Sequence, residues 1–524
     1  MRIKLSFALT ILVLILAACS TNPTGENKSE NKKQKESNGS NNKVEQIETT
    51  QIDTLTGNQF TLIAKEAKHK LNNNVTVDAW TINGSIPGSQ IRVKQGEKIK
   101  INLINELPDP VSIHWHGINV PNEMDGIPGV TQNAVQPGEN YTYEFTPSVP
   151  GTYMYHTHQE AVSQLDKGLY GSFIVEPKKK TYDRDYTLML DEWMSNPEDS
   201  SMMTNNTEGM EHSNMEGMNH GSSDQGNDDS NSSMGHDMTS YDIFTINGKS
   251  GDAIEPLKVK EGEKVRIRLA NIGYLSHKIH LHGHKFKVVA VDGQELNKPQ
   301  EIKDQLISIS PGERYDVEFT ADNPGEWYLE CHGDMDGTEG MKTKIQYEGN
   351  KNSKDQSNQD EQLPLFSYLN YGGAKNGEFT LNQTYDVEYT MELNGNNTDN
   401  IWTINGKSFP NTAGVKIEKN DLVKVKLVNN SPTGVNHPMH LHGHSFQVLS
   451  KNGKQIEGSP IVKDTINLEP GDEYVVAFKA DNPGNWLFHC HDLHHATAGM
   501  VDVIKYNGYE PNFTPDPNAK NKPE

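Results

Sequence analysis

The sequence predicts an all-β protein in which one sandwich or barrel domain is repeated three times. A Trp/Phe-Thr-Ile-Asn-Gly motif recurs at residues 80–84, 244–248 and 402–406. Each copy leads to a strand-like segment with two histidines two residues apart, and later to a Pro-Gly turn and an aromatic closing segment. Short Val-, Ile-, Tyr- and Phe-rich runs, punctuated by Gly, Pro, Asn and Asp, lie between these landmarks. This pattern is typical of β-sandwiches and barrels.

The repeat and the local composition divide the chain into domains and connecting segments. We expect domains at residues 51–178, 179–349 and 364–508. A polar linker at 350–363 precedes the third domain, and a Pro-, Asn- and Lys-rich tail at 509–524 follows it. Residues 20–50 are mainly Asn, Lys, Ser and Glu, so we expect a tether without a core of its own.

The first 19 residues have the pattern of an export signal. Arg2 and Lys4 precede an apolar run at 5–16, which is short for a transmembrane span. The following Leu-Ala-Ala-Cys resembles a bacterial lipobox, which predicts cleavage before Cys19 and lipid on its sulfur. An ordinary secretory signal is the alternative. We therefore expect an extracytoplasmic lipoprotein of the bacterial cell membrane that touches the bilayer through its lipid alone.

Charge and cysteine content narrow the function further. The net charge of −23 argues against a nucleic-acid partner and is compatible with cationic metal substrates. Apart from Cys19, the chain has only Cys331 and Cys490, in equivalent positions of different repeats, so we expect no disulfide. An exported protein that keeps free thiols uses them for another purpose, and metal ligation is the first to consider.

Residues 489–500, His-Cys-His-Asp-Leu-His-His-Ala-Thr-Ala-Gly-Met, carry the strongest metal signal. They follow an apolar run that reads as a buried strand, on which successive side chains alternate between faces. Cys490 therefore points away from both neighbouring histidines. A thiolate, an imidazole at His495 and a thioether at Met500 match three parts of a blue-copper site. Taken alone, the stretch also fits a zinc site or a buried thiol.

Aligning the repeats separates two groups of ligands. In the third domain, His437 precedes the first histidine pair. It joins Cys490, His495 and Met500 as the fourth candidate ligand of the blue site. The first domain has Val111 and Thr157 where the third has His437 and Cys490, so it cannot form a blue site. Eight histidines remain after the blue site is assigned, in four pairs spaced i, i+2: His114 and His116, His156 and His158, His440 and His442, and His489 and His491.

The repeats and the four histidine motifs resemble the three-domain bacterial multicopper oxidases, a group that includes laccases and copper-tolerance oxidases. The resemblance covers nearly all of the chain after the tether. It implies three cupredoxin-like Greek-key β-sandwich or barrel domains, four coppers per chain, and packing of the first domain against the third. It also implies the ligands: type 1 copper by His437, Cys490, His495 and Met500; type 2 by His114 and His440; type 3 by His116, His156, His158, His442, His489 and His491.

The same resemblance assigns a proton-delivery role to Asp125, which follows the first histidine motif. A turn-forming Asp-Gly pair is the plain alternative. A second acid, which some bacterial relatives carry just after the last blue-copper histidine, is replaced here by Ala496. Asp492 is the remaining, weaker candidate for that role.

The second domain keeps an incomplete set of the same residues. His277, Cys331 and Met341 align with the blue-copper ligands, whereas Asp336 replaces the second imidazole and Glu330 replaces the histidine before the cysteine. The domain also retains three further histidines, His280, His282 and His332. We interpret the Cys331 group as a degenerate site, and copper binding there is the alternative.

An insert at residues 195–240 interrupts the second domain. It is rich in Ser, Asn, Asp and Gly, so no core is expected. Thioether and imidazole together favour Cu(I). The candidate Cu(I) ligands are Met202, Met203, Met210, His212, Met215, Met218, His220, Met234, His236 and Met238. The alternative is a spacer whose methionines are incidental.

The predicted activity is one-electron oxidation of a donor coupled to reduction of dioxygen to water, with a role in copper tolerance. Cu(I) and small phenols compete as donors, and the insert favours Cu(I). A non-catalytic copper-sequestering lipoprotein is the rival, although storage does not require eight histidines in this pattern. A copper nitrite reductase fits less well, because that family has two domains. We expect a monomer.

Overall fold

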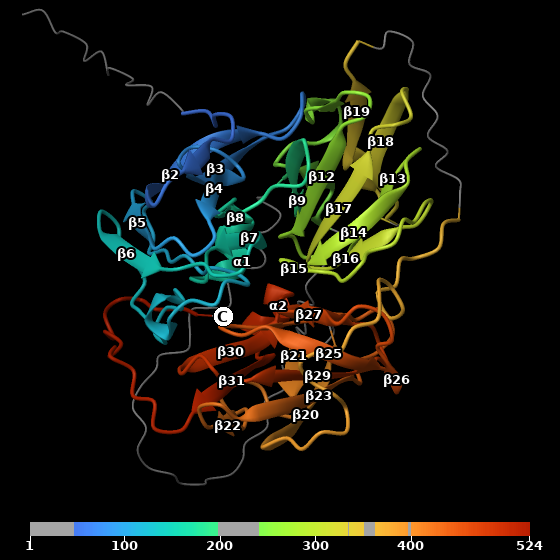
Figure 1. Cartoon of the computed structure of the whole chain (residues 1–524). Coiled ribbons are helices and arrows are strands. Elements are labelled where there is room, and N and C mark those ends of the chain that lie inside the picture. The colour runs from blue at the N-terminus through green and yellow to red at the C-terminus, as the bar shows by residue number, and fades with distance from the viewer. Residues whose placement is uncertain (1–46, 197–239, 334, 350–361, 397–399, 524) are drawn as a thin grey trace, which may run out of the picture. The chain divides into compact units, whose positions relative to one another are not determined.

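Six β-sheets, paired into three sandwiches, make up the part of the chain that the computed structural model describes (Figure 1). The described residues are 47–196, 240–333, 335–349, 362–396 and 400–523. The all-β, cupredoxin-like class expected from the sequence is thereby confirmed. Cys19, the lipobox, nearly all of the tether, the methionines and histidines of the insert and most of the linker lie outside the described residues.

The first sandwich joins sheets β3-β2-β5-β6 and β1-β4-β8-β7. Its elements are β1 (Thr54–Thr56), β2 (Gln59–Lys70), β3 (Thr76–Ile82), β4 (Gly88–Lys94), β5 (Ile99–Asn105), η1 (Asn122–Met124), β6 (Asn140–Phe145), β7 (Gly151–His156), α1 (Ala161–Leu165) and β8 (Tyr170–Glu176). Along β5, Ile99, Ile101 and Leu103 are buried while the residues between them are more exposed. This alternation of period two places one face of the sheet on the core.

The second sandwich joins sheets β10-β9-β12-β17-β14-β15 and β11-β19-β18-β13-β16. Its elements are β9 (Arg184–Trp193), β10 (Ile243–Ile246), η4 (Gly251–Ala253), β11 (Leu257–Val259), β12 (Lys264–Asn271), β13 (His277–Leu281), β14 (Phe286–Val291), β15 (Gln294–Glu295), β16 (Ile307–Ile309), β17 (Arg314–Thr320), β18 (Glu326–Cys331), η5 (Thr338–Gly340) and β19 (Lys342–Tyr347). Strand β10 pairs antiparallel with β9, so the two ends of the insert meet at one sheet edge.

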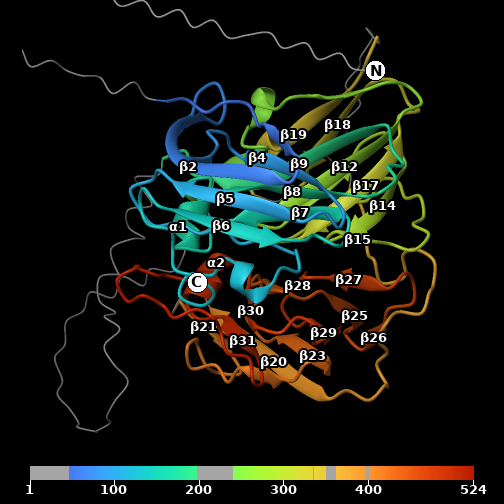
Figure 2. The ribbon, with the colours of Figure 1, turned by 60° about the vertical axis from the view of Figure 1, so that its left-hand side comes forward.

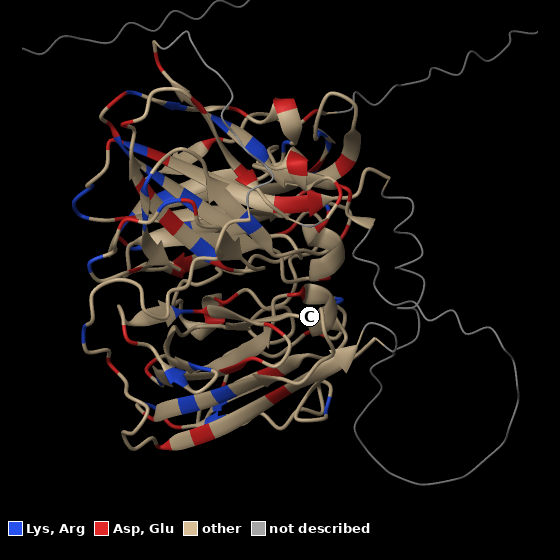
Figure 3. Ribbon diagram, turned by 90° about the vertical axis from the view of Figure 1, so that its right-hand side faces the viewer, with Lys and Arg blue, Asp and Glu red and all other residues tan. Residues whose placement is uncertain are grey.

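The third sandwich joins sheets β21-β20-β23-β29-β25-β26 and β22-β31-β30-β24-β28, with β27 paired to β25. Its elements are β20 (Val387–Asn396), β21 (Ile401–Ile404), β22 (Val415–Ile417), β23 (Leu422–Asn429), β24 (His437–Leu441), β25 (Phe446–Lys451), β26 (Lys454–Gln455), β27 (Ile461–Lys463), β28 (Thr465–Leu468), β29 (Glu473–Lys479), β30 (Asn485–Cys490), α2 (Leu493–Thr497) and β31 (Val501–Tyr506). Opposite charges face each other across neighbouring strands, for example Lys424 and Glu388 at 3.1 Å, and Figure 3 shows acids and bases interspersed here.

The second and third sandwiches repeat the same strand register. Strand β13 pairs with β18 so that Ile279 lies opposite Cys331, and β24 pairs with β30 so that Met439 lies opposite Cys490. The strands of the three sandwiches fall within the three domain ranges expected from the sequence. The domain limits themselves stay a prediction.

The three sandwiches meet along buried surfaces. Figures 1 and 2 both show the third sandwich lying across one end of the other two. The segment predicted as a C-terminal tail lies along the first domain, where the Asn521 side-chain oxygen accepts from the Ala134 amide at 2.8 Å and the Lys522 carbonyl accepts from the Glu160 amide at 3.0 Å. Within the described ranges, no helix combines the length and the apolar composition that a bilayer span requires.

One buried arginine links all three domains. Arg314 of the second domain donates from both terminal nitrogens to the Asp464 carboxylate of the third, at 2.6 and 2.5 Å. Its Nε also donates to the Thr152 carbonyl of the first domain at 3.2 Å. The arginine side chain is fully buried and that of Asp464 is 1% exposed, so water does not screen the pair.

We expect Arg314→Met to lower the free energy of unfolding by about 3–5 kcal/mol, because it leaves the Asp464 carboxylate buried without its partner. Lys424→Met is the matched control, since it removes a cation from a partly exposed pair and should cost about 1 kcal/mol or less. Urea unfolding of the two variants at equal copper loading measures both. Equal losses would contradict the linking role of Arg314.

Candidate metal centres

One group of ligand atoms surrounds Cys490 in the third sandwich. Its Sγ lies 3.7 Å from His437 Nδ1 and 3.6 Å from His495 Nδ1. All three side chains are buried. Met500 is also buried, and backbone hydrogen bonds hold it close, because its carbonyl accepts from the Cys490 amide and its amide donates to the His495 carbonyl. A thiolate, two imidazoles and a nearby thioether suit a blue-copper site.

The local structure fixes the two rings of this Cys490 group. His437 begins β24, and its Nε2 contacts the Ser431 hydroxyl at 2.8 Å, which leaves Nδ1 toward the sulfur. His495 lies on α2, whose first turn is capped by the Asp492 carboxylate, and its ring stacks on Trp402 at 3.6 Å. Burial lowers the pKa of both imidazoles, so they are neutral ligands at neutral pH.

Eight buried histidines form a second group between the first and third sandwiches. Each domain supplies two neighbouring strand segments, with His114 opposite His156 in the first and His440 opposite His489 in the third. Because side chains two residues apart on a strand share a face, each segment contributes a pair of rings. We call this set the eight-histidine cluster; it consists of His114, His116, His156, His158, His440, His442, His489 and His491.

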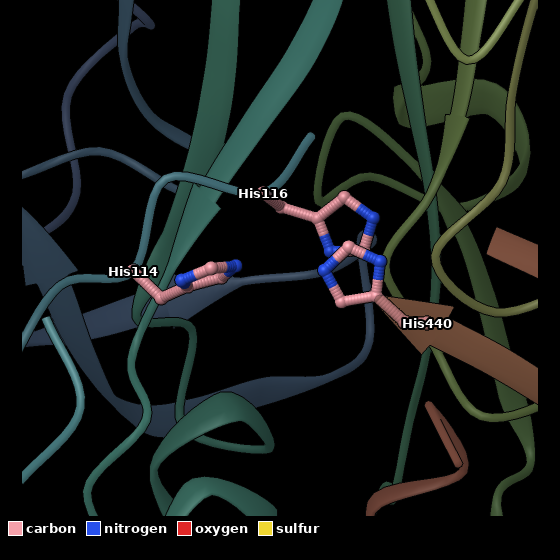
Figure 4. Close-up of side chains that lie close together, drawn as sticks. All are labelled: His114, His116 and His440. Carbon is pink, nitrogen blue, oxygen red and sulfur yellow. The ribbon is translucent and has the colours of Figure 1, made fainter. Parts of the chain in front are cut away.

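The cluster divides into overlapping subgroups whose ligand atoms lie within 4.8 Å of one another. These are His116 with His156 and His491; His158 with His442 and His489; and His114 with His116 and His440. Figure 4 shows the last subgroup, in which the rings of His116 and His440 stack at 3.8 Å while His114 lies to one side. The first two triads, together with the pair of His114 and His440, are consistent with a trinuclear copper site. Each triad and the pair contain histidines of both domains.

Hydrogen bonds determine which nitrogen three of the rings leave for a metal. His114, His156 and His440 each donate from Nδ1 to a backbone carbonyl at 2.8–3.0 Å. A neutral ring that donates from one nitrogen has a lone pair on the other. Within the described residues, the Nε2 atoms of these three rings have no hydrogen-bond partner although they are buried. A metal ion is the partner that fits such inward-facing lone pairs.

Burial also keeps seven of the eight rings in their neutral form. Desolvation lowers the pKa of His156 to about 3 and that of His440 below its usual range, and the neighbouring imidazoles add to the effect. It holds the pKa well below the usual range for His116, His158, His442, His489 and His491. Neutral imidazole is the form that binds copper.

The chain connects the two groups directly. Cys490 belongs to the first group, whereas its neighbours His489 and His491 belong to the second. The alternation of side chains along β30 explains this arrangement. The blue-type group and the eight-histidine cluster are therefore joined by a few covalent bonds.

Asp125 lies against the cluster. Its Oδ2 is 2.9 Å from His442 Nδ1 and its Oδ1 is 3.3 Å from His114 Nδ1, so one carboxylate touches rings from both domains. The following Gly126 has φ +82°, and a Cβ there would lie 1.8 Å from the Ile113 carbonyl oxygen. Only glycine allows this close approach. Asp492 lies instead at the blue-type group, with its Oδ2 3.4 Å from His495 Nε2.

Sequence reasoning missed Asp464, which also contacts the cluster. Its Oδ1 lies 3.2 Å from His116 Nε2, and its backbone carbonyl accepts from His440 Nδ1 at 3.0 Å. Arg314 holds the pKa of this carboxyl well below its usual range, against the opposing effect of burial. The available signal was a Lys-Asp pair at 463–464 that directly follows two apolar residues, at the same place in the repeat as the pair at 303–304.

The degenerate site of the second domain is only partly assembled. His277 Nδ1 lies 3.7 Å from Cys331 Sγ, and both residues are buried together with Met341. Asp336, which replaces the second imidazole, is exposed. The His277 Nε2 atom instead lies 3.7 Å from the buried Glu192 carboxylate.

The fold and the two histidine groups define a copper-dependent oxidase, and comparison with known proteins identifies its family. Family profiles described as multicopper oxidase match residues 64–180 and, in a second profile, residues 204–350 and 383–507. The chain belongs to the multicopper oxidases, which are oxidoreductases with dioxygen as acceptor. The predicted family and copper cofactor are thereby confirmed.

Individual relatives align along most of the chain. The multicopper oxidase MmcO of Mycobacterium tuberculosis is 30% identical over 82% of this chain and 83% of its own length. Copper resistance protein A of Escherichia coli is 25% identical over 86% of this chain and 93% of its own. The crystal structure of a multicopper oxidase from Pseudomonas thermotolerans is 25% identical, has a TM-score of 0.62 and covers 87% of this chain and 100% of its own.

We expect Cys490→Ser to abolish the intense thiolate-to-copper absorption in the visible and to reduce oxidase activity to background. Metal analysis should still find three coppers, because the substitution changes no residue of the eight-histidine cluster. Cys331→Ser is the matched control and should leave the visible band in place. A band that survives in Cys490→Ser and disappears in Cys331→Ser would reverse the assignment.

Proposed function

We propose that this chain is a lipid-anchored, extracytoplasmic oxidase of Cu(I) that serves copper tolerance. The type 1 ligands in this proposal are His437, Cys490, His495 and Met500, the type 2 ligands are His114 and His440, and the type 3 ligands are His116, His156, His158, His442, His489 and His491. The grouping of ligand atoms supports this division, since each type 3 triad and the type 2 pair combine residues of both domains.

Copper bound in these groups supplies one-electron oxidation of the donor and four-electron reduction of dioxygen to water. The protein excludes water from the rings, and backbone carbonyls fix the nitrogen that His114, His156 and His440 present. Asp125 is the residue we propose for proton delivery. Its carboxylate contacts rings of both domains, one of them at 2.9 Å.

A small cavity with both polar and apolar lining lies beside the blue-type group, and it supports our proposal that the electron donor is a metal ion. It has a volume of about 130 Å³ and reaches His495 itself, with Tyr274, Asn436, Asp492 and His494 among its other lining residues. A carboxylate and imidazoles among the lining residues suit a cation, whereas a phenol ring would gain more from a larger apolar slot.

The insert begins and ends close to this cavity. The Ser195 amide and hydroxyl both donate to the Asp242 carboxylate, at 2.7 and 2.6 Å, which fastens the two ends together. Next to them, the ring of Tyr241 packs on the cavity residue Tyr274 at 5.6 Å. Between these ends, the sequence carries methionines, histidines and acidic residues but no lysine or arginine. Such a segment favours Cu(I) and would raise its concentration near the entry site.

Membrane anchoring rests on the sequence of residues 1–19 and stays a proposal, as does the monomeric state. A sequestering protein would not need two triads of histidines shared between domains, which speaks against the storage alternative. The test of the proposed activity is oxygen uptake driven by Cu(I), with at least four coppers per chain counted on the same sample.

Deleting residues 195–240, with a short Gly/Ser splice, should lower Cu(I) oxidation at limiting copper and leave phenol oxidation level or higher. The thioethers collect Cu(I), whereas a phenol gains nothing from them. A full-length variant with each insert Met and His replaced by Ser is the matched control and should show the same loss. A proportional fall in both activities would mean that the insert is structural, and no change in either would make it a spacer.

Asp125→Asn should lower kcat by about 10–100-fold, the usual effect of losing a residue that supports metal ligands. The amide keeps the shape and one acceptor but cannot release a proton. Anaerobic reduction by the donor should proceed at the normal rate, while reoxidation by dioxygen slows, and stopped-flow absorbance separates the two. Slow reduction with normal reoxidation would exclude the proton-delivery role.

A further inference from the structure

The second sandwich contains a histidine group that neither the blue-type group nor the eight-histidine cluster uses. His280 and His282 lie on and just after β13, and His332 directly follows β18. One ligand atom of each lies within 4.8 Å of the other two. The rings of His280 and His282 are 4.0 Å apart, and those of His282 and His332 stack at 5.5 Å.

The strand register explains why these side chains converge. His280 lies opposite Glu330 in the β13–β18 pair, just as His440 lies opposite His489 in the β24–β30 pair. The second domain therefore presents the same half-cluster as the third, with a carboxylate in place of one imidazole. Among the described residues, the metal-ligand group that includes these histidines contains none from the first or third domain. Any ion here would therefore be held by residues of the second domain alone.

The distances in this group suit a single ion. His332 Nε2 lies 3.4 Å from His282 Nε2 and 3.7 Å from Glu330 Oε1. Ligand atoms around a tetrahedral ion with bonds of about 2.0–2.1 Å are separated by about 3.4 Å. The remaining contact, His282 Nε2 to Glu330 Oε1 at 2.7 Å, is shorter and would open when an ion enters.

Hydrogen bonding distinguishes His280 from an ordinary core histidine. His280 is only 2% exposed, yet neither of its ring nitrogens has a hydrogen-bond partner among the described residues. His284, four residues further, is buried as well, but its nitrogens contact the Tyr347 hydroxyl at 2.7 Å and the His282 carbonyl at 2.9 Å. Two unsatisfied buried nitrogens are costly unless a ligand uses them.

The charges around the group favour a cation. Burial opposes ionisation of Glu330, but its contacts with His282, His332 and Lys342 outweigh burial and hold the pKa of that carboxyl well below its usual range. Burial lowers the pKa of His280 to about 3, so this ring is a neutral ligand at neutral pH. The side chains of His282 and His332 are 6% and 11% exposed, which gives an ion access from solvent.

We propose that His280, His282 and His332, with Glu330, bind one divalent transition-metal ion, Cu(II) or Zn(II), in the second domain. Imidazole and carboxylate donors suit both ions, and the general order of affinities favours Cu(II). The site is separate from the Cys331 group and contains no thiolate, so it gives no blue colour. It does not depend on Cu(I) being the donor.

The test is a metal count on the full-length, copper-loaded protein. Cu(II) and Zn(II) are added in separate samples at about tenfold excess, unbound metal is removed, and bound metal is counted by mass spectrometry. We expect one ion more per chain in the wild type than in His280→Ala or His332→Ala. The insert is present in every sample, so any metal that it binds contributes equally to each count and drops out of the difference between wild type and variant. His284→Gln and Cys331→Ser are matched controls and should retain the extra ion.

Electron paramagnetic resonance gives a second readout, since the extra Cu(II) should add one non-blue signal that both alanine variants lack. The visible band and the unfolding temperature show whether each variant is folded. His332→Ala replaces a side chain that is more exposed than that of His280, so it provides the test if His280→Ala fails to fold. Equimolar competition then decides between Cu(II) and Zn(II). Equal counts in the wild type and His332→Ala, or loss of the extra ion in Cys331→Ser, would overturn the proposal.

Discussion

The buried pair of Arg314 and Asp464 is the interaction on which the metal centres depend. Asp464 reaches His116 of the first domain and His440 of the third, while Arg314 belongs to the second and also bonds to the Thr152 carbonyl. A second buried ion-pair group lies beside them and also joins the second and third domains. In it, the fully buried Lys463 ammonium lies 3.1 Å from both Asp292 and Glu313 of the second domain. Charges buried this deeply are tolerated only when paired, so they fix the register of the domains.

The buried ion pairs show a structural role for the second domain, although the proposed copper ligands lie in the other two domains. It clamps the third domain against the first from one side, and the C-terminal segment fastens the two from another, through Asn521 and Lys522. These contacts hold imidazoles from separate domains close enough that each subgroup has its ligand atoms within 4.8 Å of one another. The second domain also supplies Tyr274 to the cavity at the blue-type group.

Divergence of one repeated unit accounts for the range of sites. The same pair of strands carries His440 and His489 in the third domain, His114 and His156 in the first, and His280 and Glu330 in the second. Each substitution changes which ligands are available without changing the register of the strands. The third domain keeps both halves of the pattern, and the first keeps the histidine pairs. The second keeps His280, His282 and His332 together with the incomplete Cys331 group, which includes His277 and Met341.

The sequence by itself determined the all-β class, the threefold repeat and the family, because strand alternation and the fixed histidine spacings are local properties of the chain. It also predicted that Cys490 faces away from its two neighbours, which follows from the pleat of a single strand. Only the tertiary structure decided which rings converge on one another, that Asp125 touches rings of both domains, and that Asp464 and Arg314 lie beneath them. The contacts between domains among these join residues more than a hundred positions apart, and their partners are chosen by how the domains pack, which no local pattern in the chain encodes.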